Sequence, residues 1–327
     1  MEFVVSAEQS GRRLDRFLAL QMPEISRTRV QSLIDEGRVR VDGVACKPSS
    51  RIVPGETVTV EIPPAPPPGV EPEDIPLEIL YEDEDVAVVN KPAGMIIHPG
   101  AGISSGTMVA ALLHKLGGIE GLSTIGGPLR PGIVHRLDKD TSGAVVIARN
   151  NSAHRKLVDE FRKRLVEKTY LALLHGRVKG DSGSIDLPIT RDLRRRSRMT
   201  ARRREGRQAR TDWRVLLRLG GFTLVEAALH TGRTHQIRVH FSALGSPVVG
   251  DTLYGAPRQE RAGAELLPHL GRNFLHAARV AFVHPRSGER IDVRAPLPPD
   301  LLAYINDVAH RSGTDASIID AALRNFL

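Results

Sequence analysis

Residues 135–143, HRLDKDTSG, gather more ionisable side chains than a simple connection between two secondary-structure elements needs. The nine residues include an imidazole, two cations and two carboxylates, Asp138 and Asp140. Apolar runs with β-branched residues flank them at 132–134 and 144–148, so the pattern predicts a strand, a loop and a strand. The alternative to a functional loop is a hairpin whose charges only pair with one another, because structural ion pairs also concentrate charge.

The loop does not have the pattern of a metal site or of a Ser/His/Asp hydrolase. His135, Asp138 and Asp140 offer nitrogen and oxygen ligands, but Arg136 and Lys139 are interleaved with them and no second ligand cluster follows. A serine follows at 142 without the glycine elbow between strand and helix that activates a hydrolase nucleophile. No phosphate-binding glycine loop is present in the chain either. We therefore expect no metal.

Two later segments carry further candidate side chains. Tyr170 lies in EKTYLALLHG, where 169–174 is predicted to be a strand, and a tyrosine there is most often part of a core or its rim. The segment LHTGRTHQIRVHFSALG predicts a loop that enters a helix ending near Gly245. Arg233 precedes that helix, and His235 and Arg238 are one turn apart. Anion binding or a salt bridge at the helix start is compatible with this pattern and with a catalytic site.

The net charge of +8 is concentrated in one segment. Residues 191–210 contain ten arginines, two acidic residues and no lysine, so this segment alone accounts for the net charge of the chain. A solvated basic loop would explain such a run, but the planar arginine fork suits phosphate oxygens and base edges. The run indicates nucleic-acid binding, for which we name Arg194, Arg195, Arg196 and Arg198.

Composition sets the outer limits of the fold. A chain of 327 residues, 41% of them hydrophobic, is expected to form two or three domains. The single cysteine, Cys46, cannot form an intrachain disulfide, and no apolar stretch has the length of a signal peptide or a membrane span. These features predict a cytoplasmic protein without a membrane segment.

The first 63 residues are expected to form a small domain of two helices followed by a β-element. Apolar spacing predicts helices around Leu14 and Val30, and an Asp42-Gly43 pair signals a hairpin. Arg27 and Arg29 lie near the second helix and would contact RNA if the domain binds it. This arrangement resembles the S-four-type RNA-binding module, with an ordinary helical cap as the alternative. Seven prolines fall within 63–76, which predicts a semi-rigid linker over 64–76.

Five segments together resemble the RluA-type pseudouridine synthase family, and the N-terminal module makes the chain most similar to its RluD branch, which acts on the large ribosomal subunit. They are NKPAGMIIHPG, RPGIVHRLDKDTSG, EKTYLALLHG, TGRTHQIRVH and GDTLYG, in family order, and the resemblance runs from about residue 11 to 301. It implies an α+β catalytic domain over 77–302, with a mixed, largely antiparallel sheet and a central cleft. Residues 303–327 match no motif and are expected to form a tail or a helix.

The resemblance also assigns roles to individual residues. Asp138 is implied to be the catalytic carboxylate, because the charge that develops on the sugar resembles that of glycoside hydrolysis. Arg233 is implied to be its ionic partner. Tyr170 is implied to be catalytic, since it packs against the uracil and takes part in the proton transfer that restores the aromatic ring. Arg136 would fill the space that the flipped base leaves, and the remaining cleft residues implied to contact RNA are Lys91, His98 and His235. No cofactor is implied.

The implied substrate is structured ribosomal RNA of the large subunit or its assembly precursor, bound by a monomer. Only 13 residues are Phe, Trp or Tyr, which does not suit a stacking platform for single strands. Two alternatives stay open. A tRNA-directed member of the same family would share every catalytic motif, and a noncatalytic RNA-binding or ribosome-assembly factor would use the basic surface without needing Asp138.

Overall fold

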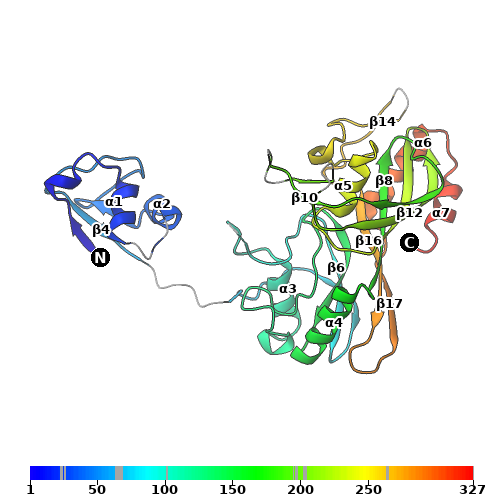
Figure 1. Cartoon of the computed structure of the whole chain (residues 1–327), viewed down its shortest axis with the longest axis horizontal. Helices are drawn as coiled ribbons and strands as arrows, with labels where there is room; N and C mark the ends of the chain where they lie inside the picture. Colours follow the sequence, from blue (N-terminus) through cyan, green and yellow to red (C-terminus); the bar gives the residue numbers. More distant parts are fainter. Residues whose placement is uncertain are drawn as a thin grey trace. The chain divides into compact units, whose positions relative to one another are not determined.

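The computed structural model describes residues 1–22, 25, 27–62, 69–100, 102–193, 195, 198–201, 205–262 and 265–326. The chain divides into two compact units, Met1–Pro68 and Gly69–Leu327, each with its own hydrophobic core. Figure 1 shows the two units coloured along the sequence. None of the described helices is both long enough and apolar enough to cross a membrane.

The N-terminal unit packs two helices against a small antiparallel sheet with the strand order β1-β4-β2-β3. Leu14, Phe17 and Leu33 are among the residues that fill its core, as the helical spacing predicts. The Asp42-Gly43 turn has positive φ at both residues, which is the conformation of a tight hairpin between β2 and β3. Sequence patterns did not indicate β1. The elements are β1 (Glu2–Val4), η1 (Ala7–Gln9), α1 (Leu14–Gln21), α2 (Arg27–Asp35), β2 (Val39–Val41), β3 (Val44–Ala45) and β4 (Thr57–Val60).

The second unit is organised around a nine-stranded sheet in the part of it that the structure describes. Its order is β5-β6-β7-β16-β8-β13-β12-β9, and β17 pairs with β16. Strands β7 and β16 pair in parallel, whereas the other pairings are antiparallel, so the α+β fold with a mixed, mostly antiparallel sheet is confirmed. The strands are β5 (Glu78–Glu82), β6 (Val86–Lys91), β7 (Ser142–Ala148), β8 (Glu167–His175), β9 (Ser182–Asp186), β12 (Arg210–Leu219), β13 (Phe222–Leu229), β16 (Leu275–Val283) and β17 (Arg290–Arg294).

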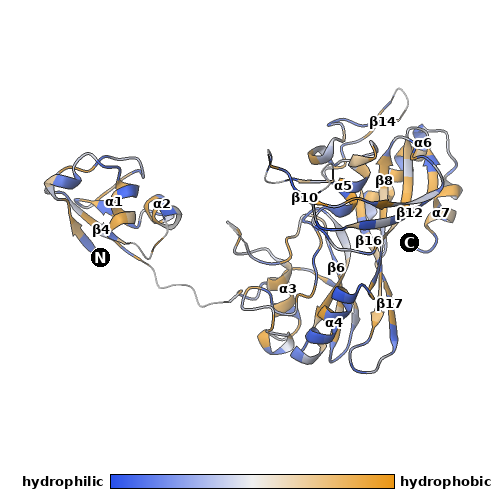
Figure 2. Ribbon diagram, in the orientation of Figure 1, coloured by the Kyte–Doolittle hydropathy of each residue, from blue (hydrophilic) through white to orange (hydrophobic). Residues whose placement is uncertain are grey.

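Helices and short hairpins surround this sheet. Figure 2 shows that α3 is mainly hydrophobic, whereas α4 carries both hydrophobic and hydrophilic residues, as expected for a helix with one buried face. The helices are α3 (Met108–Lys115), η2 (Ile119–Gly121), α4 (Asn151–Lys163), α5 (Gln236–Ala243), η3 (Thr252–Tyr254), α6 (Pro299–Arg311) and α7 (Ala316–Leu323). The hairpins are β10 (Thr190–Arg191) with β11 (Met199–Thr200) and β14 (Arg261–Ala262) with β15 (Glu265–Leu266).

The segment before the ionisable loop differs from the prediction. Residues 132–134 do not form a strand, and Ile133 makes only an isolated bridge to Ile147. Gly132 has a φ of 72°, and a Cβ there would lie 2.9 Å from side-chain carbons of Ile147 and Leu122. The chain therefore makes a tight turn just before the loop 135–141, and only β7, which follows the loop, is a continuous strand.

Two leucines are exposed because they lie just beyond the end of a helix. Leu165 is 60% exposed because α4 ends at Lys163, and Leu244 is 48% exposed because it follows the last residue of α5. Helix ends depend on local hydrogen bonds more than on apolar spacing.

Both ends of the second unit belong to its core. Of the predicted linker, residues 63–68 lie outside the described residues, whereas Glu73 donates its backbone N–H to Ala110 O (3.0 Å) and Ile75 packs on the core. The C-terminal boundary at 302/303 falls inside α6, where Tyr304 and Ile305 are buried with Leu323 of α7. Residues 303–326 are therefore helices that complete a core and not a detached tail.

Candidate active site

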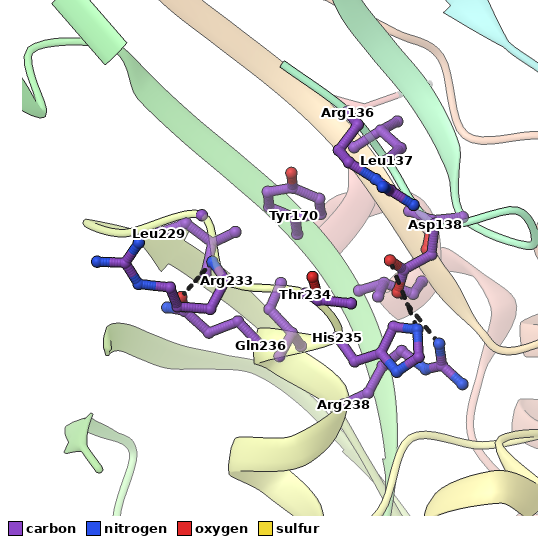
Figure 3. A pocket seen from close by; sticks show the side chains of 14 residues that line it. Arg136, Leu137, Asp138, Tyr170, Leu229, Arg233, Thr234, His235, Gln236 and Arg238 are labelled. Atoms are coloured by element: carbon purple, nitrogen blue, oxygen red, sulfur yellow. Dashed lines mark hydrogen bonds and ion pairs between the residues drawn. The ribbon is translucent and has the colours of Figure 1, made fainter. Parts of the chain in front are cut away.

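A pocket of about 90 Å³ opens where the loop before β7 faces the start of α5, with β8 as its wall. Figure 3 shows Arg136, Asp138, His235 and Arg238 on one side of the pocket and Arg233 on the other. The loop contributes Asp138 close to β7, and β8 contributes Tyr170. The polar lining includes Arg136, Asp138, Tyr170, Arg233, Thr234, His235, Gln236 and Arg238.

One buried guanidinium joins two carboxylates in this pocket. Arg238 donates from Nη1 to Asp138 Oδ2 (3.1 Å), and it donates from Nε and Nη2 to Asp251 Oδ2 and Oδ1 (2.6 and 2.9 Å). Burial acts to lower the pKa of Arg238, but the hydrogen bonds and charge of Asp251, with those of Asp138, outweigh it and the pKa is raised. Arg238 is therefore a permanent cation that holds the orientation of Asp138.

The structure corrects the expected partner of Asp138. Arg233 donates from Nε to Gln208 O (3.1 Å) and forms no contact with Asp138. Figure 3 places the side chains of Arg233 and Arg238 on different sides of the pocket. The physical reason is the position of the helix start: Arg233 precedes α5 in a loop that the Gln236 side chain holds, and Arg238 lies in the first turn with its side chain turned into the protein.

His235 lies beside Asp138 at the start of α5. It has a φ of 58°, and its Nε2 lies 3.9 Å from Asp138 Oδ1. Its Nδ1 lies 2.7 Å from the hydroxyl of Tyr254, which accepts a hydrogen bond from Met199 N. Burial lowers the pKa of His235 despite the opposing charge of Asp138, so the ring is neutral near pH 7.

Tyr170 forms the wall of the pocket. Its side chain comes from β8, is 7% exposed, and lies among the pocket residues with Asp138. Burial, and secondly the charge of Asp138, raise the pKa of Tyr170. The phenol therefore stays protonated at neutral pH and presents a flat, uncharged ring.

Lys91 supports the loop and does not line the cleft, so its predicted contact with RNA is wrong. Its side chain is fully buried, and Nζ donates to the carbonyl oxygens of Pro92, Met95 and Lys139 (2.7, 2.9 and 2.9 Å). The three acceptors satisfy all three donors of an ammonium group. Burial lowers its pKa to about 7. Lys91 thus ties the loop that carries Asp138 to the end of β6.

A second buried network holds the other end of the loop. Arg272 donates from Nη1 to Ser142 Oγ (2.9 Å) and pairs with Asp300. Ser142 Oγ also lies 3.0 Å from His276 Nδ1, and His276 Nε2 donates to Ala295 O (3.1 Å). Ser142, which is not placed as a nucleophile, instead anchors the start of β7.

His98 and Arg136 lie at the edge of the site, as predicted. Arg136 is exposed and lines the pocket rim, and His98 is half-buried in an adjoining cavity that also contains Asp138, His235 and Arg238. His98 Nδ1 lies 2.8 Å from Pro99 O, so its Nε2 is available to the cavity.

The predicted RNA contacts outside the cleft are partly described. Arg27 donates to Asp15 Oδ2 (2.7 Å), which is fully buried and also binds Arg13, so its charge is already paired. No side-chain contact of Arg29 is described, and Arg194 and Arg196 lie outside the described residues. Arg195 is exposed. Arg198 instead lies 5.1 Å from the ring centroid of Tyr254, next to the active site.

Sequence reasoning missed the roles of Asp251 and Tyr254, which lie in GDTLYG, a segment recognised as a motif without a role. It noted Arg238 only as one of several basic residues near a helix start. The sequence feature that could have indicated Asp251 is its acidic side chain in the short motif GDTLYG. Its partner Arg238 lies 13 residues earlier in the chain, and only the fold brings the two side chains together.

One group of described residues could by distance share a metal ion, namely Asp83, Asp85 and His284. These ligands already have partners: Arg286 pairs with Asp85, Tyr81 donates to Asp83 (2.5 Å), and His284 pairs with Asp83. The group therefore lies in the turns between β5 and β6 and between β16 and β17, is held by protein partners, and does not line the pocket at Asp138.

Comparison with known proteins finds a family match in each of the two units. A family model described as RNA pseudouridylate synthase matches residues 85–243, and an S4 domain model matches residues 12–58. An uncharacterized RNA pseudouridine synthase of Aquifex aeolicus is 48% identical over 88% of this chain and 90% of its own. The ribosomal large subunit pseudouridine synthase D of Zymomonas mobilis is 42% identical over 92% and 95%. The structure of human RNA pseudouridylate synthase domain containing 1 is similar with a TM-score of 0.53 at 32% identity, over 68% and 84%.

Proposed function

The chain belongs to the RNA pseudouridylate synthase family, and from this premise we propose that it converts uridines of large-subunit ribosomal RNA to pseudouridine with Asp138 as the catalytic carboxylate. Support for the substrate comes from relatives 41–42% identical that are named ribosomal large subunit pseudouridine synthase D. The S4 domain at residues 12–58 supplies a second RNA-binding module.

The observation that carries the mechanism is the placement of one guanidinium between two carboxylates. Asp138, Arg238 and Asp251 together carry a net charge of one negative unit at the pocket, and the oxygen of Asp138 not bonded to Arg238 is free to face a ligand. The reaction breaks the C1′–N1 bond, and positive charge develops at C1′. A fixed anion next to C1′ stabilises that charge or bonds to it.

The uracil then rotates and its C5 bonds to C1′, while the C5 hydrogen leaves as a proton and N1 gains one. Tyr170 packs against the flat ring during this rotation, because it is the aromatic wall of the pocket. Its raised pKa makes the neutral phenol the resting form, so Tyr170 acts as a wall and not as a base at the start of the reaction.

The target uridine must leave its helical stack to reach the pocket, at a cost of a few kcal/mol. Arg136 lies two residues before Asp138, exposed at the rim, with its side chain free to enter the space that the base vacates. A guanidinium also stacks on neighbouring bases, which offsets part of the unstacking cost.

The test of this function is the variant Asp138→Asn, which removes the charge and keeps the shape. Purified protein is incubated with an unmodified transcript of large-subunit ribosomal RNA, and pseudouridine is mapped by carbodiimide modification and primer extension. We expect no pseudouridine from the variant, with RNA affinity unchanged. Asp140→Asn, in the same loop, is the matched control and should retain activity, because Asp140 is exposed and does not line the pocket that contains Tyr170.

Mapping in a strain without the protein decides the substrate. Loss of pseudouridine from the large-subunit RNA supports the proposal, and loss from tRNA alone would identify the tRNA-directed alternative. Normal turnover by Asp138→Asn would overturn the mechanism. A protein that binds RNA but forms no pseudouridine would be the assembly factor considered above.

A further inference from the structure

A second groove of about 490 Å³ joins the pocket at Arg136, Tyr170 and Arg233 and extends past the C-terminal end of α4. Phe161 and Val158 of α4 contribute apolar side chains to it. We call it the basic groove because six cationic residues line it. One of them is Arg162, and the other five, which we call the groove cations, are Arg136, Arg164, Lys168, Arg207 and Arg233. Nothing in the mechanism above uses Arg164, Lys168 or Arg207.

The five groove cations are not neutralised by the protein. Within the described part of the chain, none of the five forms an ion pair with a carboxylate, whereas neighbouring Arg162 pairs with Asp159 and Arg210 with Asp212. Burial, followed by the charges of Arg207 and Arg164, lowers the pKa of Arg233. The guanidinium groups thus repel one another across the groove. Such a concentration of like charge attracts an anionic ligand.

Backbone contacts hold these cations in place before any ligand arrives. Arg207 exchanges two backbone hydrogen bonds with Ile189 (2.9 and 3.0 Å), and Arg233 Nε is bound to Gln208 O. Arg164 has a φ of 63° at the end of α4, a position that usually favours glycine. An arginine that keeps this unfavourable conformation indicates that its side chain has a use there.

The floor of the basic groove is aromatic. The ring of Phe161 stacks on His135 with 4.6 Å between centroids, and Lys168 Nζ lies 5.6 Å from the centroid of the Phe161 ring. An apolar floor with cations around it matches a ribose between phosphates, because the sugar carbons need contact and the phosphates need charge.

We propose that the basic groove binds the sugar–phosphate backbone of the RNA strand adjoining the uridine in the pocket, with Arg164, Arg207 and Arg233 as phosphate contacts. This inference rests on the proposed function for the location of the uridine. It gives Arg233 the role of a backbone contact in place of an ionic partner of Asp138. Because phosphate contacts carry no base information, the groove holds the strand in register and does not select its sequence.

The first test measures binding of an unmodified transcript of large-subunit ribosomal RNA across a salt series, using Arg164→Gln/Arg207→Gln. Each lost phosphate contact should flatten the log–log slope by about 0.7 to 0.9, and affinity at 0.15 M salt should fall roughly four- to five-fold per contact. The matched control is Arg177→Gln/Arg324→Gln, which removes two exposed arginines that do not line the groove. If both double variants change the slope and the affinity equally, the effect comes from the net charge of the protein and the proposal is wrong.

A second variant separates binding from folding. Arg164→Gly suits the positive φ, so we expect a higher melting temperature together with weaker RNA binding. A structural role would move stability and binding in the same direction. Unchanged binding in Arg164→Gly and an unchanged slope in the double variant would refute the groove.

The binding assay and the pseudouridine assay fail independently. If no pseudouridine forms but the groove variants flatten the slope, the groove stands as an RNA site and the proposed function fails. If pseudouridine forms and the slope does not change, the function stands and the groove proposal is wrong.

Discussion

The assignment of Arg238 as the partner of Asp138 is tested by Arg238→Lys, which keeps the charge and removes the fork. Three hydrogen bonds leave this guanidinium, two to Asp251 and one to Asp138. A single ammonium group cannot reproduce them, and the carboxylate of Asp251, 1% exposed against 19% for Asp138, should capture it because it is less able to recover hydration. Asp138 would then lose both its cation and its fixed orientation.

The rate constant of the chemical step should fall by about 10²-fold, the order of loss found when one preorganised electrostatic contact is removed or misplaced. The free energy of unfolding should fall by about 2 to 3 kcal/mol, because charged hydrogen bonds are lost while one cation–carboxylate contact remains. RNA affinity should not change, since Arg238 is buried and its net charge is conserved.

The assay is single-turnover release of tritium from RNA labelled at uracil C5, because that hydrogen leaves when C5 bonds to the sugar. Saturating enzyme separates the chemical step from binding. Arg233→Lys is the matched control, with the same substitution five residues away, and should keep the rate constant within about two-fold, far less than a lost catalytic contact costs. A slow Arg233→Lys with a fast Arg238→Lys would show that the resting contacts do not persist in the complex and would refute the reasoning.

Three further outcomes are expected. Lys91→Met leaves the carbonyl groups of Pro92, Met95 and Lys139 without their ammonium donor, so urea unfolding should show a loss of about 2 kcal/mol, with slower turnover because the Asp138 loop loosens. Burial lowers the pKa of His276 to about 4, so the unfolded chain binds a proton between about pH 6.5 and 4 that the folded chain does not, and stability should fall as pH falls through this window. His276→Gln should reduce that slope by up to about 1.4 kcal/mol per pH unit, measured by urea unfolding at several pH values. Deleting residues 1–63 should weaken RNA binding or change which sites are modified while the second unit keeps residual turnover, which pseudouridine mapping would detect.

Residues within one contiguous motif were the most predictable part of the site. Asp138 and Arg136 are two residues apart in the same loop. Once that loop is predicted to form the site, both residues are expected at the pocket. The position of Tyr170 at the site was implied only by the family resemblance, because a tyrosine in a strand is most often part of a core or its rim. All three line the same pocket.

The ionic partner was not predictable because it depends on where a helix starts. Arg233 and Arg238 are five residues apart in TGRTHQIR, and either could face Asp138. The choice is made by the Gln236 side chain, which accepts hydrogen bonds from Arg233 N (3.0 Å) and Thr231 Oγ1 (2.7 Å) and donates to Arg210 O. These contacts come from β12 and the preceding loop, so they form only in the folded protein.

Lys91 shows a related limit of sequence reasoning. A lysine next to a polar loop is normally exposed, and a buried lysine needs several acceptors to converge on it. Two of its three acceptors lie within four residues, but the third, Lys139 O, comes from the catalytic loop. Its burial therefore depends on the contact between two distant segments.

The basic groove shows why the location of charge in sequence and in space can differ. The remainder of the chain outside 191–210 contains equal numbers of acidic and basic residues, so counting along the sequence points only to the arginine run. Many arginines elsewhere form ion pairs with carboxylates, such as Arg214 with Glu226 and Arg279 with Asp292. Of the five groove cations only Arg207 lies in the run, and the other four come from separate segments. Because electrostatic potential adds by distance and not by sequence position, these unpaired cations create a field beside the catalytic pocket that local charge counting cannot find.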